Sequence, residues 1–143
     1  MEETRANRNA ALVFQWTVYY MTEKKKLKEV DLYKPIQNLL KKQGYEVRGE
    51  VKDCDIAAVK GDSLVIVELK LNLTIDLLLQ ATKRQKLTDE VYVAIPRPKN
   101  FRSKRWKEIC QLVKRLELGL VVVSFTASRK RAEVVFEPTA FTG

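Results

Sequence analysis

The sequence predicts a single α/β domain with a mixed central β-sheet flanked by helices. The chain has 143 residues, 45% of them hydrophobic and 31% charged, which is ordinary for one globular domain. Three segments carry apolar residues at helical spacing, and several shorter ones are compact runs rich in β-branched residues. They follow one another as helix, three strands, helix, strand, helix, strand, an order typical of an α/β fold with a mixed sheet.

The first half of the domain is expected to be one helix and three strands. Residues 30–43 have a helical apolar pattern, with Gly44 placed to end the helix. Residues 45–51 alternate weakly and are expected to be the first strand. Two apolar runs follow at residues 56–59 and 64–69. The sequence Lys60-Gly61-Asp62-Ser63 between them is typical of a β-hairpin loop.

The second half is expected to add two helices and up to three strands. The helices are predicted at residues 75–87 and 103–118, the second of them ended by Gly119. The strands are predicted at residues 91–95, closed by Pro96, at 120–125, and at an edge strand of residues 134–136. Residues 126–131 are expected to be a basic turn before that edge strand.

Residues 1–22 are expected to be an accessory N-terminal extension, and residues 23–143 the domain itself. The apolar run at residues 10–21 is too short to span a bilayer. Trp16 and Tyr19 stand where a signal peptide would have a small-residue cleavage site. We therefore expect a cytoplasmic protein that does not enter the membrane. A peripheral membrane protein that uses residues 13–20 and a basic surface is a further alternative.

The charge balance favours a polyanionic partner. The net charge is +9, from 27 lysines and arginines against 18 acids. Such an excess is typical of proteins that bind nucleic acid, although it also serves solubility. The chain has no histidine and only two cysteines, which excludes histidine-based catalysis and the usual zinc and iron sites. Carboxylates are the metal ligands that remain, and they suit Mg²⁺ or Mn²⁺.

The predicted hairpin brings three charged residues together. If Gly61 and Asp62 form a two-residue loop, Asp55 stands directly opposite Glu68, on the same face of the sheet. Lys70, two residues after Glu68, shares that face. Because the hairpin is apolar on both faces, it is expected to be buried and central. Two carboxylates side by side at the end of such a sheet repel each other and favour a bound cation.

This arrangement suits metal-assisted cleavage of phosphodiesters. Asp55, Glu68 and the carbonyl of Leu69 can hold Mg²⁺ or Mn²⁺ and leave positions for water and a phosphate oxygen. Lys70 can position the water, help to deprotonate it and stabilise the transition state. The alternative is a structural salt-bridge cluster. A Glu-x-Lys pattern alone is weak evidence, since a second one occurs at Glu23 and Lys25.

These residues resemble a known superfamily. The string Cys54-Asp55-Ile56 … Val65-Ile66-Val67-Glu68-Leu69-Lys70, between helix–strand units, resembles the PD-(D/E)XK nucleases. The segments Leu32-Tyr33-Lys34-Pro35, Gly44-Tyr45-Glu46-Val47 and Leu77-Leu78-Leu79-Gln80-Ala81 are similar to a bacterial family of PD-(D/E)XK-type phosphodiesterases. The resemblance covers roughly residues 30–119. It implies a restriction-endonuclease-like core (αβββαβ), metal binding by Asp55 and Glu68, and a catalytic Lys70. Cys54 stands where the name would place proline.

Further residues are candidates for the site and for binding nucleic acid. Superfamily members often carry a polar or basic residue from the second helix into the site. Here that catalytic residue is expected to be Gln80 rather than Arg84, which is also a candidate nucleic-acid contact, although a solvated helix flank suits both. Glu29, Asp31 and Glu50 are weaker candidates for an additional metal-directed acid. A run without acids offers further nucleic-acid contacts, with Phe101 and Trp106 interleaved: Arg97, Lys99, Arg102, Lys104, Arg105 and Lys107. Trp106 shares a helical stripe with Ile109 and Val113, which favours a core position for it over a base-stacking one.

The expected function is a Mg²⁺- or Mn²⁺-dependent endonuclease or phosphodiesterase that acts on nucleic acid, with DNA as the expected substrate. The alternative is a catalytically silent nucleic-acid-binding or protein-interaction module on the same fold. Small nucleases of this kind often use a second copy of the chain to cut both strands, so a homodimer is one of the expected states of this protein.

Overall fold

The computed structural model describes residues 27–51, 55–126 and 129–141, and the side chains of residues 49–51 and 55 lie outside the description. The predicted N-terminal extension and Cys54 therefore fall outside the described residues. The helices of the described part are α2 (Val30–Lys42), α3 (Ile75–Arg84) and α4 (Lys104–Arg115). Its strands are β1 (Glu46–Val51), β2 (Asp55–Lys60), β3 (Ser63–Leu69), β4 (Val91–Pro96), β5 (Gly119–Phe125) and β6 (Lys130–Phe136).

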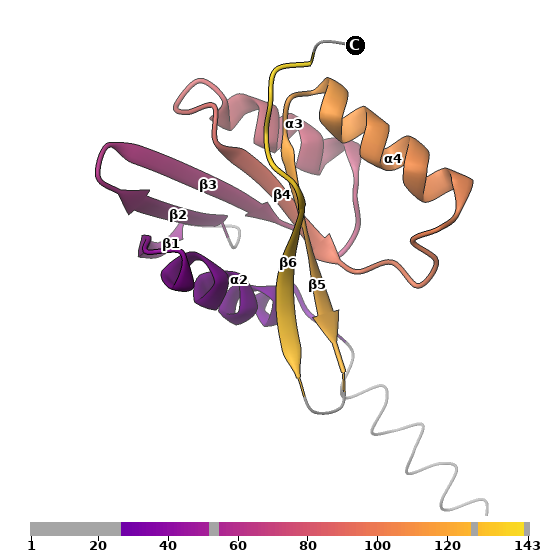
Figure 1. Ribbon diagram of the computed structural model, residues 1–143, viewed down its shortest axis with the longest axis horizontal. Helices are drawn as coiled ribbons and strands as arrows, with labels where there is room; N and C mark the ends of the chain where they lie inside the picture. Colours follow the sequence, from indigo (N-terminus) through magenta and orange to yellow (C-terminus); the bar gives the residue numbers. More distant parts are fainter. Residues whose placement is uncertain (1–26, 52–54, 127–128, 142–143) are drawn as a thin grey trace, which may run out of the picture.

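The six strands form one mixed sheet in the order β1-β2-β3-β4-β5-β6 (Figure 1). The pairs β3–β4 and β4–β5 are parallel, and the other neighbours are antiparallel. Helices α3 and α4 make the two connections between parallel strands, as parallel pairing requires. The prediction of an α/β fold with a mixed sheet is confirmed.

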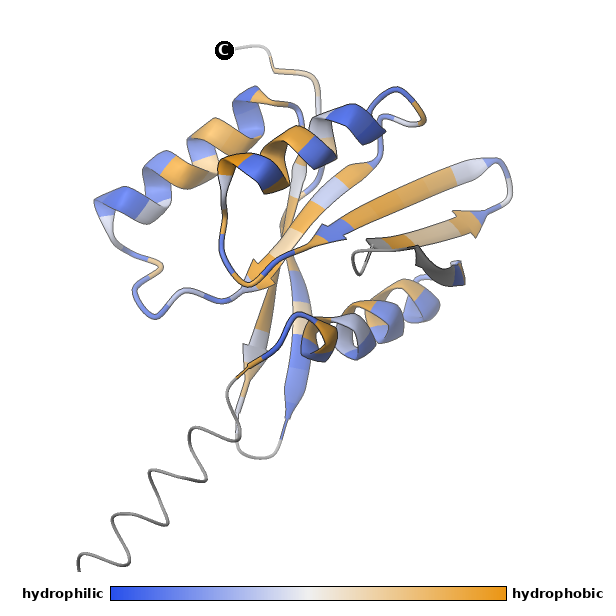
Figure 2. Cartoon of the chain, turned by 180° about the vertical axis from the view of Figure 1, so that it is seen from behind, coloured by the Kyte–Doolittle hydropathy of each residue, from blue (hydrophilic) through white to orange (hydrophobic). Residues whose placement is uncertain are grey.

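Helices cover both faces of this sheet. Helix α2 packs on one face through Leu32, Ile36 and Leu40, and α3 and α4 pack on the other. Each face has its own apolar core, and strand β3, which lies between them, is orange over most of its length in Figure 2. The strands β3 and β5 are nearly continuous apolar runs because they are buried on both faces. Within the described ranges, no helix is long and apolar enough to cross a membrane.

The helices α3 and α4 begin at capping side chains. Thr74 Oγ1 accepts a hydrogen bond from the backbone N–H of Leu77 at 3.2 Å, and Ser103 Oγ accepts one from Trp106 at 3.1 Å. A hydroxyl that accepts from the third residue of a helix satisfies a donor that the helix leaves unpaired. Pro35 lies inside α2, which nevertheless continues to Lys42.

Both α3 and α4 end three residues earlier than predicted. In α4 the left-handed residue after the helix is Glu117, with φ of 62°, and not Gly119. Gly119 instead begins β5, where a Cβ atom would lie 2.5 Å from the ring of Tyr92. The glycine is thus needed for close packing and not for the helix end.

The last strand is longer than predicted. Strand β6 starts at Lys130, whereas the sequence predicts it only from residue 134. Lys130 and Arg131 are exposed and Ala132 is buried. The first half of this edge strand therefore lacks the apolar pattern from which a strand is predicted. Charges on an edge strand hinder pairing with other chains.

Candidate active site

The hairpin that carries the candidate site has the predicted register. Ile56 pairs with Val67, and Lys60 pairs with Ser63, which leaves Gly61 and Asp62 as the two-residue loop. Gly61 has φ of 58°, the left-handed conformation that such loops require and glycine supplies. Continued by one step, this register would place Asp55, at the start of β2, opposite Glu68. The side chain of Asp55 lies outside the described residues, so its distance from Glu68 stays a prediction.

Glu68 is the central residue of the described site. Its side chain is 1% exposed, and it is the one buried charged residue in the part of the chain that the structure describes. Its Oε1 atom accepts a hydrogen bond at 2.8 Å from Nε of Arg84, in the last turn of α3. The second carboxylate oxygen, Oε2, has no hydrogen-bond donor among the described residues. Within the described part of the chain, the carboxylate therefore has one donor, and that donor binds Oε1.

Lys70 follows directly after β3. Its backbone N–H donates to the carbonyl of Ala94 at 3.1 Å, which extends the parallel pairing with β4 by one step. Its Nζ atom lies 3.8 Å from Oε1 of Glu29, the residue just before α2, and both side chains are about a third exposed or less. The sequence named Glu29 as a candidate acid but did not predict its pairing with Lys70.

The two ion pairs lie at the same end of β3 and involve different helices. Glu68 pairs with α3 on one face of the sheet, and Lys70 pairs with the residue before α2, which packs on the other face. Within the described structure, no hydrogen bond or ion pair joins the side chains of Glu68 and Lys70 to each other. The described residues contain no group of three acidic or cysteine side chains that could hold a metal. The side chain of Asp55, the predicted second acid, lies outside the described residues.

The donor set nevertheless fits a hard divalent cation. Mg²⁺ and Mn²⁺ take carboxylate and carbonyl oxygens and keep several waters, so they need few protein ligands. Among the described residues, Oε2 of Glu68 is a buried oxygen to which no donor is assigned. The predicted third ligand is the carbonyl of Leu69, the last residue of β3, whose side chain is fully buried in the core under α2.

The two candidates on α3 have different surroundings. Gln80 is half-buried one turn before Arg84, and the described residues give it no hydrogen-bond partner. Arg84, a predicted nucleic-acid contact, binds Glu68 and keeps 38% of its side chain exposed. The sequence therefore identified Arg84 as close to the site but missed its role as the partner of Glu68. The arginine lies 16 positions after the acid, and no local pattern links residues at that separation.

The basic run lies at the same end of the sheet as Glu68. It occupies the loop after β4 and the first turn of α4, and its cationic residues are all exposed: Arg97, Lys99, Arg102, Lys104, Arg105 and Lys107. Because β3 and β4 are parallel, this loop leaves the sheet beside Lys70. Trp106 is buried in the core under α4, which confirms the alternative of a core residue.

Two shifted pKa values lie outside the candidate site. Burial, followed by the charge of Glu90, raises the pKa of Tyr92 to about 12. Burial also raises the pKa of Cys110, so its thiol is poorly suited to act as a nucleophile at neutral pH. Neither group offers an alternative reaction centre.

Comparison of the chain with protein-family models, with characterised proteins and with solved structures finds no match. The resemblance to PD-(D/E)XK nucleases therefore stays a prediction from the sequence.

Proposed function

We propose that this protein is a cytoplasmic, metal-dependent phosphodiesterase of the PD-(D/E)XK type that cleaves nucleic acid, with DNA as the substrate. Asp55, Glu68 and the carbonyl of Leu69 would bind Mg²⁺ or Mn²⁺, and Lys70 would act on the attacking water. The observation that carries the proposal is the buried carboxylate of Glu68, whose Oε2 has no donor among the described residues.

Burying the carboxylate of Glu68 costs free energy if its Oε2 atom has no partner, and a bound ligand would supply one. Buried polar atoms are nearly always hydrogen-bonded, and leaving one unsatisfied costs about 1–3 kcal/mol, more when the group is charged. The neighbouring strand positions Ile66, Val67 and Leu69 are all buried and apolar. An apolar residue at position 68 would pack there without this cost. A cation bound to Oε2 would offset this cost and would explain why position 68 carries a carboxylate.

The arrangement of elements also supports the proposal. The order helix, three strands, helix, strand, from α2 to β4, is that of the restriction-endonuclease-like core which the resemblance implies. Glu68 and Lys70 lie at the carboxyl end of β3, beside the parallel strand β4. Ligands of open α/β sheets characteristically bind outside the carboxyl ends of parallel strands.

The residues around the site have separable roles in this mechanism. A bound divalent ion would activate water and offset the charge that builds on the phosphate. Lys70, held by Glu29 at 3.8 Å, would donate to the water or to a phosphate oxygen with its remaining N–H groups. Arg84 would fix the orientation of Glu68 through Nε. The basic loop after β4 would hold the phosphate backbone nearby.

A second candidate function has an observation in its favour. The charges of Glu68 and Lys70 already have partners in Arg84 and Glu29. Such pairing is expected if these charges form a structural salt-bridge cluster, in a nucleic-acid-binding or protein-interaction module that has no catalytic activity. A metal titration followed by thermal melting separates the two, since an ion that binds the folded state stabilises it by about 2.7 kcal/mol at 100 times its Kd.

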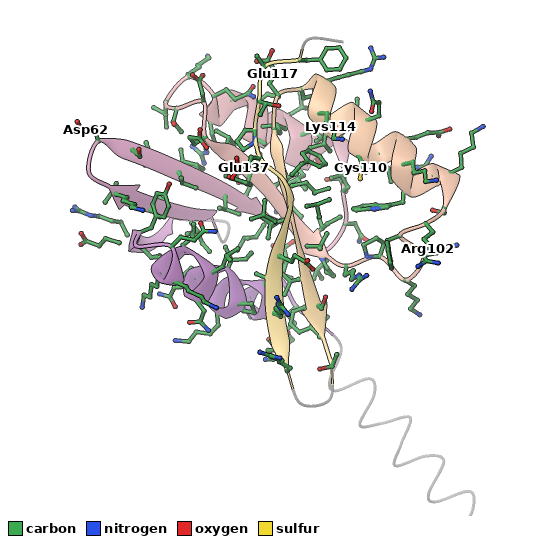
Figure 3. The ribbon with its side chains drawn as sticks, in the orientation of Figure 1. Asp62, Arg102, Cys110, Lys114, Glu117 and Glu137 are labelled. Atoms are coloured by element: carbon green, nitrogen blue, oxygen red, sulfur yellow. The ribbon has the colours of Figure 1, made fainter. Side chains whose placement is uncertain are left out.

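The direct test is cleavage of labelled single- and double-stranded DNA with Mg²⁺ or Mn²⁺. Glu68→Gln and Lys70→Met should each lower the rate at least 100-fold, because each removes a group that acts in the reaction. Asp55→Asn should do the same. The matched controls are Asp62→Asn, at the exposed tip of the same hairpin (Figure 3), and Lys86→Met, at an exposed position after α3.

Circular dichroism and melting curves would show that each variant is folded. If the controls lose as much activity as the site variants, or if the wild-type protein cleaves no DNA with either metal, the phosphodiesterase proposal is wrong.

A further inference from the structure

A groove of about 260 Å³ lies between the loop after β4 and the edge strand β6. Arg97 and Phe101 form its wall on the loop side. Trp106 of α4 and, from β6, Glu133 and Val135 also line it. Phe101 and Val135 are 42% and 43% exposed. The groove is thus partly apolar and open to solvent.

The groove and Glu68 lie on the same face of the sheet. Ile66 of β3 and Val93 and Ile95 of β4 all pack in the core under α3 and α4, and Glu68 and Arg97 continue this alternation. Glu68 pairs with Val93, four residues before Arg97. Strand spacing therefore puts the backbones of Glu68 and Arg97 roughly 14 Å apart. A short run of nucleotides can bridge that distance along the carboxyl ends of β3 and β4.

The Phe101 ring is a stacking platform set among cations. The guanidinium of Arg97 lies 4.2 Å from the ring centroid, and that of Arg102 lies 5.8 Å from it. Arg102 projects from the loop that leads into α4 (Figure 3). Bases of single-stranded nucleic acid stack on aromatic rings and on arginine planes, while nearby cations hold the phosphates. The surroundings of Phe101 offer both kinds of contact.

Glu133 decides which part of a nucleotide the groove can accept. Its exposed carboxylate lines the groove wall opposite Arg97. A carboxylate repels phosphate but accepts hydrogen bonds from the amino groups of bases. The phosphates therefore belong on the outer, cationic side of the loop and the base belongs inside. A paired base is covered by its neighbours in the duplex and cannot enter, whereas an unpaired base can.

We propose that this groove binds one unpaired base of a single-stranded DNA segment next to the cleavage site. The inference relies on the proposed function for the class of its ligand, and it specifies that function further. The protein would act on substrates with a single-stranded portion, such as overhangs, flaps or unpaired strands, in preference to continuous duplex.

The test is the binding of fluorescein-labelled DNA, measured by anisotropy in EDTA so that no cleavage occurs. Phe101→Ala should weaken the binding of a single-stranded oligonucleotide about tenfold, because base–aromatic stacking contributes about 1–3 kcal/mol per base. The same change should leave the weaker binding of a blunt duplex within about twofold. Arg97→Gln should weaken both, since it removes a positive charge that attracts the DNA backbone whether or not a base is stacked.

The chain offers a matched control on another surface. Phe141 is 37% exposed and lies 5.0 Å from the guanidinium of Arg115, beyond the C-terminal end of α4. Phe141→Ala and Arg115→Gln should leave single-strand binding unchanged. The inference fails if Phe101→Ala binds single strands as tightly as the wild type does, if Phe141→Ala loses as much, or if the wild type binds no single-stranded DNA.

The two proposals fail separately in these experiments. Wild-type protein that shows this binding pattern in EDTA but never cleaves DNA with any metal supports the groove and contradicts the phosphodiesterase. Wild-type protein that cleaves DNA while Phe101→Ala leaves single-strand binding unchanged supports the phosphodiesterase and contradicts the groove.

Discussion

Replacing Arg84 with methionine should be among the most destabilising changes available at a partly exposed position of this protein. Arg84→Met keeps most of the length of the side chain but removes the donor to Glu68, which lies 2.8 Å away. The carboxylate is 1% exposed, so it would stay charged in the interior without a direct partner, or would have to take up a proton. Either outcome costs free energy only in the folded state.

The magnitude follows from the burial of the two partners. Breaking a fully buried ion pair by removing one partner costs about 3–5 kcal/mol. Arg84 keeps 38% of its side chain exposed, so water already screens part of the interaction, and about 2–3 kcal/mol is expected. For a domain of this size that loss corresponds to a fall in Tm of roughly 8 °C.

The assay is urea unfolding followed by far-ultraviolet circular dichroism. Arg48→Met is the matched control, because Arg48 pairs with Glu46 at 3.6 Å while both side chains are about two-thirds exposed. That pair should contribute less than about 0.5 kcal/mol. The double variant Glu68→Leu/Arg84→Met should recover most of the lost stability, since replacing a buried pair with apolar residues is often neutral. If Arg84→Met destabilises the protein no more than Arg48→Met does, the role assigned to Arg84 is wrong.

Four further predictions concern stability. Gly119→Ala should cost about 1–3 kcal/mol in chemical unfolding, because its Cβ would lie 2.5 Å from the Tyr92 ring; no loss would contradict this close packing. Burial raises the pKa of Tyr92 from 10.0 to about 12, so its contribution to stability is complete below pH 10 and is lost as the pH rises to about 12. Between these pH values the free energy of unfolding should therefore fall less in Tyr92→Phe than in the wild type, and an equal fall would refute this. Leu77→Ala should lower the free energy of unfolding by about 2–5 kcal/mol, because the side chain is fully buried between α3 and the sheet; a loss under about 1 kcal/mol would contradict that packing. Glu117→Gly should raise the free energy of unfolding by about 0.5–1 kcal/mol, and Tm with it, since φ of 62° favours glycine. A fall in Tm would show that the hydrogen bond from the backbone N–H of Phe141 to Glu117 outweighs the backbone strain.

Local sequence signals were sufficient for most of the fold. The loop residues Gly61 and Asp62 specify the hairpin register, and the buried β-branched runs mark β3 and β5 as central strands. Where the predictions failed, a contact distant in the sequence decided the outcome. Gly119 follows a helix and resembles a helix end, but Tyr92, on the neighbouring strand, is what requires a glycine there. Strand β6 was only partly predicted, because an edge strand needs no apolar pattern in its charged first half.

The candidate site was predicted in part for a similar reason. The spacing of Glu68 and Lys70 along one strand, and the register opposite Asp55, are local properties of the hairpin. The partners Arg84 and Glu29 come from helices on different faces of the sheet, and only the packing of α2 and α3 places them there. The sequence could name both as candidates but could not assign either to its partner.

The proposed function requires a divalent cation at Glu68, at the end of β3, and a crystal grown with Mn²⁺ would reveal it. We expect an anomalous-difference peak at coordination distance from Oε2 of Glu68, with Asp55 and the carbonyl of Leu69 as further ligands, and no such peak in Glu68→Gln crystals. A peak elsewhere, or an Oε2 atom hydrogen-bonded only to protein or water at saturating Mn²⁺, would contradict it.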